Sequence, residues 1–256
     1  MKMNIVNFSG GKDSAATVIL CHEHNIKVDR IIFSEVMFDS EISGELPEHI
    51  DFIKNRAIPQ FEEWGFKTEI LHANKTYMDC FNQVATRSKV PERNGKRYGF
   101  PMSGKCIINS ECKVKPIKDY LKRLKAEGVD IVQFLGIAID EPERLQRLDG
   151  KTKISILAKY GYTEQMAFEL ASKYNLLSPI YGFAPRGGCW FCPNARYCEH
   201  KHLRTFHRNL WNILLKLEEE KGLVGDVWNT RSRRSIHQQE EMFQWEERQM
   251  NIFDFI

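Results

Sequence analysis

The stretch from Met3 to Cys21, MNIVNFSGGKDSAATVILC, decides the fold. Its apolar first part predicts a buried strand, and its second part predicts a helix that opens near Asp13. In the turn between them, Ser9, Gly10 and Gly11 can bring backbone N–H groups close to an anion at the positive end of the helix. We therefore expect a phosphate-binding turn. It is not the Walker A pattern GxxxxGK(S/T), because the two glycines here are adjacent.

The full string SGGKDS, which follows an apolar strand and precedes AATVIL, resembles the PP-loop of the ATP pyrophosphatase superfamily. The resemblance includes the branch related to phosphoadenosine phosphosulfate (PAPS) reductases. In that superfamily the loop holds the outer phosphates of ATP while the α-phosphate is attacked, which gives an adenylated substrate and pyrophosphate.

The resemblance implies that this chain binds an adenine nucleotide, ATP with Mg²⁺. Lys12 would neutralise phosphate charge, and Asp13 would hold the loop or the magnesium ion, so both are catalytic candidates. Ser9 and Ser14 would donate hydroxyl hydrogen bonds to the phosphates.

The order of apolar runs and helical patterns predicts an α/β fold with a doubly wound, mostly parallel sheet of the HUP or Rossmann-like PP-loop kind. The expected strands cover 3–8, 30–34, 67–72 and 130–139, with an edge strand or extended segment at 177–181. The expected later helices cover 47–64, 117–128, 163–174, 202–217 and 235–249. We expect a nucleotide-binding α/β domain over 1–182, followed by a cysteine-cluster segment and a helical C-terminal extension over 183–256.

The composition favours a folded cytoplasmic protein. The hydrophobic content is 42%, which supports a sizeable core, and no apolar run approaches the length of a membrane span. The start MKMNIVNF lacks the layout of a signal peptide. The net charge of +3 is too small to identify a nucleic-acid binder, and seven cysteines in this setting indicate metal or redox chemistry rather than disulfides.

Further site residues are expected at the carboxyl ends of the strands, where open α/β sheets bind ligands. The strand that ends near residue 139 places Glu141 and Arg144 beside the turn as catalytic candidates, and Gly136 lets the backbone approach a ligand. Ser34, at the end of the second strand, is a nucleotide-binding candidate through the resemblance. The family usually has an arginine where Ala138 stands, so one phosphate or sulfate contact of true PAPS reductases is missing. A solvated helix start is the alternative for Glu141 and Arg144.

A group of cysteines near the end of the predicted sheet indicates a metal site. Cys189 and Cys192 are separated by two residues, which lets both sulfur atoms face one ion, and Cys198 follows after five more. The preceding glycines permit the tight turn that such thiolates favour. Cys21 lies in a predicted helix and is best explained as a small buried hydrophobic residue. Cys80 stands outside the set.

The fourth ligand has several candidates. Cys112 is the first, because the resemblance places it at the start of a helix near the ligand-binding end of the sheet; Cys106 is the second, and His200 or His202 would complete a zinc site. Four thiolates fit structural Zn²⁺ or a 4Fe-4S cluster, and spacing does not separate the two. The resemblance favours the 4Fe-4S cluster, because several PAPS reductase relatives carry one near the nucleotide. A site without metal is the remaining alternative.

The resemblance implies an ATP pyrophosphatase or sulfurtransferase, which cleaves ATP to AMP and pyrophosphate and adenylates a substrate for sulfur transfer. The alternative is a thiol-dependent reductase of PAPS or adenylylsulfate. Such enzymes typically use a cysteine in a C-terminal ECGLH-like motif, and no cysteine follows Cys198 here. A further alternative is a non-catalytic nucleotide-binding subunit of a modification or defence complex.

Two groups of basic residues make tRNA or DNA a candidate acceptor. The first is the run Arg231, Arg233 and Arg234, and the second lies on one predicted helix: Arg196, Lys201, Arg204 and Arg208. Solvated surfaces are the alternative for both. A sulfur-donor protein is a candidate partner, and the sequence leaves the acceptor, the donor and the oligomeric state open.

Overall fold

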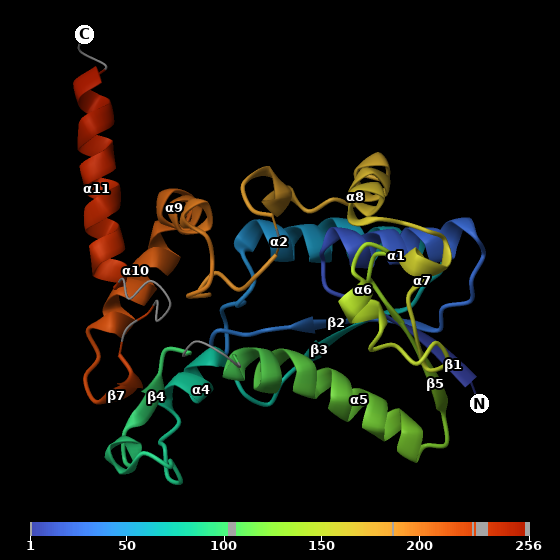
Figure 1. Cartoon of the computed structure of the whole chain (residues 1–256), viewed down its shortest axis with the longest axis horizontal. Helices are drawn as coiled ribbons and strands as arrows, with labels where there is room; N and C mark the ends of the chain where they lie inside the picture. Colours follow the sequence, from blue (N-terminus) through green and yellow to red (C-terminus); the bar gives the residue numbers. More distant parts are fainter. Residues whose placement is uncertain (1, 102–105, 186, 227, 229–234, 254–256) are drawn as a thin grey trace.

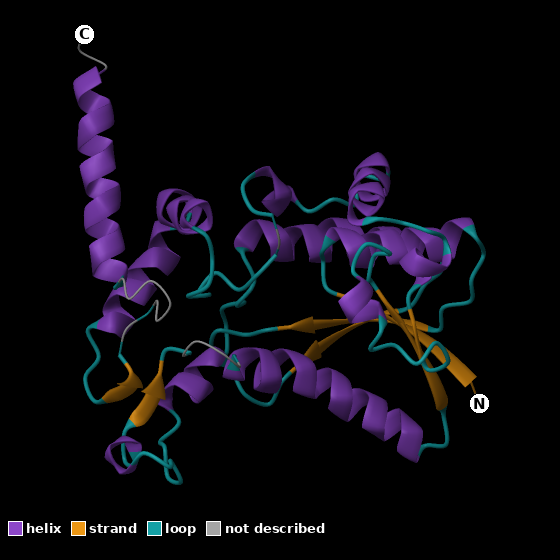
Figure 2. Ribbon diagram, viewed as in Figure 1, coloured by secondary structure: helices purple, strands orange, loops and turns teal. Residues whose placement is uncertain are grey.

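A five-stranded parallel sheet forms the centre of the chain in the computed structural model (Figures 1 and 2). The structure describes residues 2–101, 106–185, 187–226, 228 and 235–253. The strand order is β3-β2-β1-β5-β6, and every neighbouring pair is parallel. The bounds are Lys2–Phe8 for β1, Arg30–Glu35 for β2, Thr68–His72 for β3, Asp130–Leu135 for β5 and Lys153–Ile154 for β6.

Helices cover both faces of this sheet, as the alternation of side chains in β1 requires. Val6 and Phe8 pack with α1 (Lys12–Glu23), α3 (Ile58–Glu63), α7 (Ile156–Lys159) and α8 (Glu164–Lys173). Met3 and Ile5 point to the opposite face and pack against α5 (Lys115–Ala126), which runs along that side (Figure 1). The predicted doubly wound α/β sheet is therefore confirmed.

A second hydrophobic core lies beside the sheet and combines segments that are distant in sequence. It contains Phe38 from the loop after β2, Tyr77 from α4 (Tyr77–Asn82), Trp190 and Phe191 from the cysteine segment, and Trp211 from α10. The remaining elements are α2 (Pro47–Phe52), α6 (Pro142–Leu145), α9 (Tyr197–Phe206), α10 (Arg208–Glu218), α11 (Ile236–Phe253) and a two-stranded parallel pair of β4 (Arg97–Gly99) and β7 (Leu223–Gly225). The division at residue 182 stays a prediction.

Three local expectations were wrong. The strand expected over 130–139 ends at Leu135. The segment from Pro179 to Gly182 is a short 3-10 turn rather than a strand, because Pro179 begins it and the Tyr181 N–H bonds back to Ser178 O. The helix expected over 202–217 is divided at His207, whose backbone adopts φ −131° and ψ 55°.

The helix predicted over 163–174 is present as α8, with Thr163 accepting a hydrogen bond from Met166 N as its N-cap. Within the ranges that the structure describes, no helix is long and apolar enough to cross a membrane.

Candidate functional site

The turn between β1 and α1 has the backbone geometry of an anion-binding loop. Gly10 has a φ of +78°, and a Cβ atom there would lie 2.4 Å from His49 Cε1, so only glycine fits. Gly136, just beyond β5, packs directly on the start of α1, because a Cβ atom on it would lie 2.7 Å from Ser14 N. The two glycines therefore hold the turn, the helix N-terminus and the end of β5 in close contact.

Hydrogen bonds inside the turn define its shape. The Ser9 N–H donates to Ser14 Oγ over 3.1 Å, and the Ser14 hydroxyl donates to Gly11 O over 2.9 Å. The N–H of Lys12 donates to the hydroxyl of Tyr181 over 2.9 Å. The Tyr181 hydroxyl thus occupies a position at the helix N-terminus where an anionic oxygen would also be stabilised.

A cavity of about 280 Å³ opens at this turn. Its lining contains six of the residues predicted from the sequence: Ser9, Gly11, Asp13, Ser14, Gly136 and Arg144. Asn7, Leu135 and Ile137 complete the lining. The carboxyl ends of β1 and β5 are neighbours in the sheet, which is why these residues meet.

Lys12 and Asp13 form a partly buried ion pair at the cavity. Lys12 Nζ lies 2.9 Å from Asp13 Oδ1 and 3.4 Å from a carboxylate oxygen of Glu164 on α8. Burial lowers the pKa of Lys12, but the hydrogen bond and charge of Asp13 outweigh it, so that this pKa is raised overall. Burial raises the pKa of Asp13 despite the contact with Lys12. Lys12 is therefore a cation that contacts two carboxylates. A bound anion could take the place of these carboxylates as its partner.

Glu141 and Arg144 pair with each other at the start of α6. Glu141 is the N-cap residue, and its carboxylate accepts the Ala138 N–H over 3.2 Å as well as the Arg144 guanidinium. Arg144 reaches the cavity lining. The small side chain of Ala138 contributes no cation.

Ser34 lies near the carboxyl end of β2, one residue beyond the Phe33–Phe8 pair in the sheet register. Its hydroxyl is buried and has no hydrogen-bond partner among the described residues. The next residue, Glu35, is also buried and binds Lys54 and His72. Ser34 is therefore close in register to the turn but outside the lining of its cavity.

Three further residues contact the turn without having been singled out from the sequence. They are His49, whose Nε2 lies 3.3 Å from Ser9 O, together with Tyr181 and Glu164. The side chain of His49 is fixed on its other edge by Ser178 Oγ at 2.8 Å, and burial lowers its pKa. Their contacts connect positions far apart in the sequence, so no local motif indicated them.

Part of the predicted cysteine set lies around a second cavity, of about 320 Å³. Cys189, Cys192 and Cys106 line it, with Lys113 nearby. Burial raises the pKa of Cys189 well above its ordinary value, and the neighbouring Glu45 carboxylate adds to this. Cys106, the second candidate for a fourth ligand, is thus placed with the CxxC pair.

Cys112 is buried and outside the lining of this cavity, and its sulfur lies 3.9 Å from that of Cys80. The sulfur–sulfur hydrogen bond raises the pKa of Cys112 and lowers that of Cys80. Cys198 is exposed on α9. In the described ranges, no three cysteines have sulfur atoms within 4.8 Å of one another.

The two histidines considered as zinc ligands lie apart from these sulfur atoms. His200 Nε2 faces Cys192 O at 3.3 Å, and burial lowers the pKa of His200 to about 4. His202 pairs with Glu48 instead. The predicted basic run at Arg231, Arg233 and Arg234 lies outside the described residues.

Fold and site together define an α/β protein with a glycine-containing turn and a cavity at the carboxyl edge of a parallel sheet. No protein-family model matches the chain. It is 26% identical over 222 residues to an uncharacterised protein of Methanocaldococcus jannaschii, which covers 80% of this chain and 45% of that protein. The chain thus spans about half the length of this curated relative.

Among solved structures, the U34-tRNA thiolase NcsA from Methanococcus maripaludis with its 4Fe-4S cluster is similar at a TM-score of 0.41. The sequence identity is 16%, over 95% of this chain and 72% of that chain. Similarity at this level carries no argument about function, which must be argued from the geometry of the site.

Proposed function

We propose that this protein is a PP-loop enzyme that cleaves ATP to AMP and pyrophosphate and thereby adenylates an acceptor for sulfur transfer. One observation carries the proposal: Ser9, Gly11, Asp13 and Ser14 of the turn line a single cavity at the N-terminus of α1, together with Gly136 just beyond β5 and Arg144 on α6. Arg144 faces this cavity, and Lys12 lies beside it in contact with Asp13; with the N–H groups of the turn they supply the donors that bind a polyphosphate.

Each residue has a role in this proposal. Backbone N–H groups of Gly10 and Gly11 and the side chain of Lys12 would bind the outer phosphates. Arg144 would stabilise the charge that develops as the α-phosphate is attacked, with Glu141 as its positioning partner. When Lys12 pairs with the phosphates instead of Asp13, the Asp13 carboxylate would be available to bind Mg²⁺. An acceptor oxygen attacks the α-phosphorus and pyrophosphate leaves; a sulfur nucleophile then displaces AMP.

The cysteine segment fits a sulfur-binding metal centre by its donor chemistry, because soft thiolates select zinc or iron–sulfur clusters. Cys189 and Cys192 would bind it together with Cys112 and Cys198, as the sequence predicts. A bound 4Fe-4S cluster would hold or deliver sulfur. A single Zn²⁺ held by all four of Cys112, Cys189, Cys192 and Cys198 would require their sulfur atoms to move closer together than they are here.

The experiment that tests adenylation uses iron-loaded protein under anaerobic conditions. It is incubated with ATP labelled at the α-phosphate, alone and with bulk tRNA or DNA, and AMP is resolved from ADP. We expect AMP and pyrophosphate, with the stimulating polymer identifying the acceptor class. Release of sulfite from PAPS with a thiol donor, without AMP formation, would contradict the proposal and favour a reductase.

A substitution connects the activity to the turn. Lys12→Ala should weaken ATP binding at least about tenfold, since a charge-assisted phosphate contact is lost. The matched control is Lys27→Ala, because Lys27 is exposed and pairs with Asp29 away from the cavity. Equal ATP affinity in the folded Lys12→Ala and Lys27→Ala variants would show that Lys12 does not bind the phosphates.

A further inference from the structure

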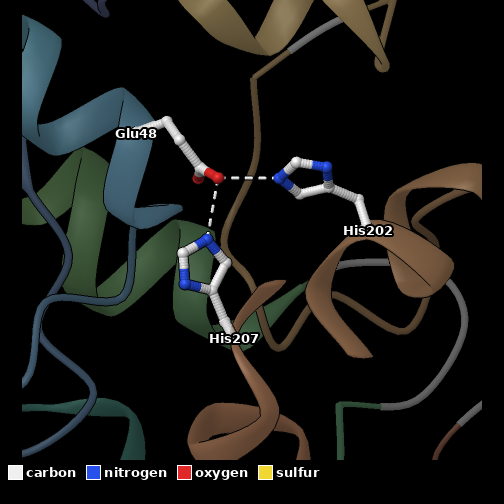
Figure 3. A group of neighbouring side chains, drawn as sticks. All are labelled: Glu48, His202 and His207. Atoms are coloured by element: carbon white, nitrogen blue, oxygen red, sulfur yellow. Dashed lines mark hydrogen bonds and ion pairs between the residues drawn. The ribbon is translucent and has the colours of Figure 1, made fainter. Parts of the chain in front are cut away.

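Three side chains from separate elements meet outside both cavities described above (Figure 3). Glu48 extends from α2, His202 from α9, and His207 from the junction of α9 and α10. Glu48 Oε1 lies 2.7 Å from His202 Nε2 and 2.8 Å from His207 Nε2. The three ligand atoms all lie within 4.8 Å of one another, and this is the single group of its kind in the described ranges.

Packing fixes the two imidazole rings in this arrangement. The His202 ring stacks on Phe183 with a centroid distance of 3.6 Å and an interplanar angle of 6°. The rings of His202 and His207 are 5.9 Å apart and inclined by 56°, so both present Nε2 to one point. Their side chains are only 15% and 19% exposed.

The second carboxylate oxygen of Glu48 makes the group unusual for a simple ion pair. Glu48 Oε2 is buried and has no hydrogen-bond partner among the described residues, while Oε1 serves both histidines. A buried carboxylate oxygen without a partner is energetically costly. Both imidazoles contact the same oxygen, Oε1. A cation bound by the three side chains could contact both oxygens of the carboxylate and so remove this cost.

We propose that Glu48, His202 and His207 bind one divalent transition-metal ion of the zinc class. Two imidazoles and one carboxylate form a three-ligand set of the type that holds Zn²⁺ with a fourth position open to water or another ligand. Hard cations such as Mg²⁺ and Ca²⁺ prefer all-oxygen ligands, which this group does not supply.

The geometry requires only a small adjustment to accept the ion. Zinc bonds to nitrogen and oxygen of about 2.0 Å in a tetrahedral arrangement place the ligand atoms about 3.3 Å apart. The present contacts are 2.7 and 2.8 Å, so the carboxylate must withdraw by roughly half an ångström. Rotation of the Glu48 side chain provides this movement without a change in the backbone.

The proposed metal site shares no ligand with the cysteine set or with the proposed nucleotide site, and its position gives it a defined structural effect. It would tie α2 to the α9–α10 junction, where the chain leaves helical geometry at His207. The residue after Glu48 is His49, which contacts Ser9 O in the anion-binding turn. Metal binding would thus fix the C-terminal helices on the α/β sheet through one helix of the nucleotide site.

The test measures zinc binding to the anaerobically purified full chain and the ligands of the bound ion by X-ray absorption. We expect one zinc with nitrogen and oxygen ligands in addition to any sulfur-bound metal. His202→Asn, His207→Asn and Glu48→Gln should each weaken this zinc at least about 100-fold, since each removes or weakens one ligand. His237→Asn is the matched control, because His237 lies on α11 and is 45% exposed.

Two results would overturn the proposal: sulfur-only coordination of all bound zinc, or an unchanged nitrogen-bound zinc in the His202→Asn and His207→Asn variants. If a variant fails to fold, the absorption spectrum of the wild-type protein still decides, because thiolate and imidazole ligands differ in it. A loss of this zinc with unchanged ATP binding would support the metal site, and a loss of ATP cleavage alone would concern only the proposed function.

Discussion

Gly136, just beyond the end of β5, packs directly on the backbone at the start of α1. Its Cα faces the backbone of Asp13 and Ser14, where an added Cβ would come within 2.7 Å of Asp13 C and Ser14 N. Backbone cannot move aside as a flexible side chain can, so an alanine at this position must push α1 and the end of β5 apart.

We predict that Gly136→Ala weakens ATP binding at least about tenfold and destabilises the protein by about 1–3 kcal/mol. Calorimetric titration with ATP and urea unfolding measure the two effects. The control is Gly182→Ala, because a Cβ atom on Gly182 meets nothing within 4 Å and its φ is not positive. Normal ATP affinity in Gly136→Ala would show that the close contact has no part in nucleotide binding.

Whether a site residue could be predicted from the sequence depends on how far apart in the chain its contacting residues are. The SGGKDS turn, Gly136 and Arg144 could be predicted because a local motif and the end of a regular strand carry the information. Tyr181 and His49 could not, since they reach the turn from 169 and 40 residues away in the chain. The predicted cysteine quartet still lacks a test, and the position of Cys106 beside Cys189 and Cys192 makes it the first alternative ligand.

At the level of elements, the C-terminal helices illustrate why periodicity alone was insufficient. The apolar positions of 202–217 predict one helix, and Leu203, Leu210 and Leu214 are indeed buried. Phe206, however, is 68% exposed, and the chain turns at the next residue. The side-chain pairing of His207 with Glu48 is a tertiary contact that a helical pattern does not contain.

One buried carboxylate of α11 contacts both α9 and α10. Glu240 accepts hydrogen bonds from Arg204, Arg208 and Trp211 Nε1 and is 7% exposed. Burial by itself would raise the pKa of Glu240, but the hydrogen bonds from Arg204 and Arg208 outweigh it and hold this pKa far below its ordinary value of 4.5. A carboxyl group with a lowered pKa in the folded state stabilises the fold above its unfolded pKa, and this stabilisation is lost as the pH falls.

We predict that Glu240→Gln destabilises the protein by about 2 kcal/mol near neutral pH, because the buried Arg204 keeps only the half-exposed Glu247 as its carboxylate partner. Below the ordinary value of 4.5, the difference between wild type and variant should shrink by about 1 kcal/mol per pH unit. Urea unfolding across this range measures both.

The matched control for this prediction is Glu246→Gln. Glu246 lies on the same helix and binds Lys201 and Tyr197, but its side chain is 30% exposed. Exposed pairs contribute at most about 1 kcal/mol. Equal destabilisation by the two variants, or a pH-independent difference for Glu240→Gln, would mean that the buried network does not hold α11.

At the scale of the whole molecule, the segment Gly44–His49 joins the proposed nucleotide site to the cysteine segment. Gly44 O accepts the Trp190 N–H over 3.0 Å, and Glu45 pairs with Cys189 in a short antiparallel bridge. At the other end of the segment, His49 contacts Ser9 O. A series of contacts therefore runs from Ser9 through α2 and Glu45 to the backbone at Cys189 and Trp190.

We predict that ATP binding slows amide hydrogen exchange beyond the turn itself. His49 lies against Gly10, so ordering of the turn by the phosphates restricts α2 and, through Gly44 and Glu45, the bridge to Cys189. The amides of Gly44 and Trp190 should become several-fold slower to exchange with a non-hydrolysable ATP analogue, as measured by mass spectrometry. Helix α5, which packs on the opposite face of the sheet, should remain unchanged and serves as the internal control. Protection confined to residues 9–14 and 136 would mean that the two sites bind their ligands independently, and equal slowing in α5 would indicate a general stabilisation rather than a connection through this segment.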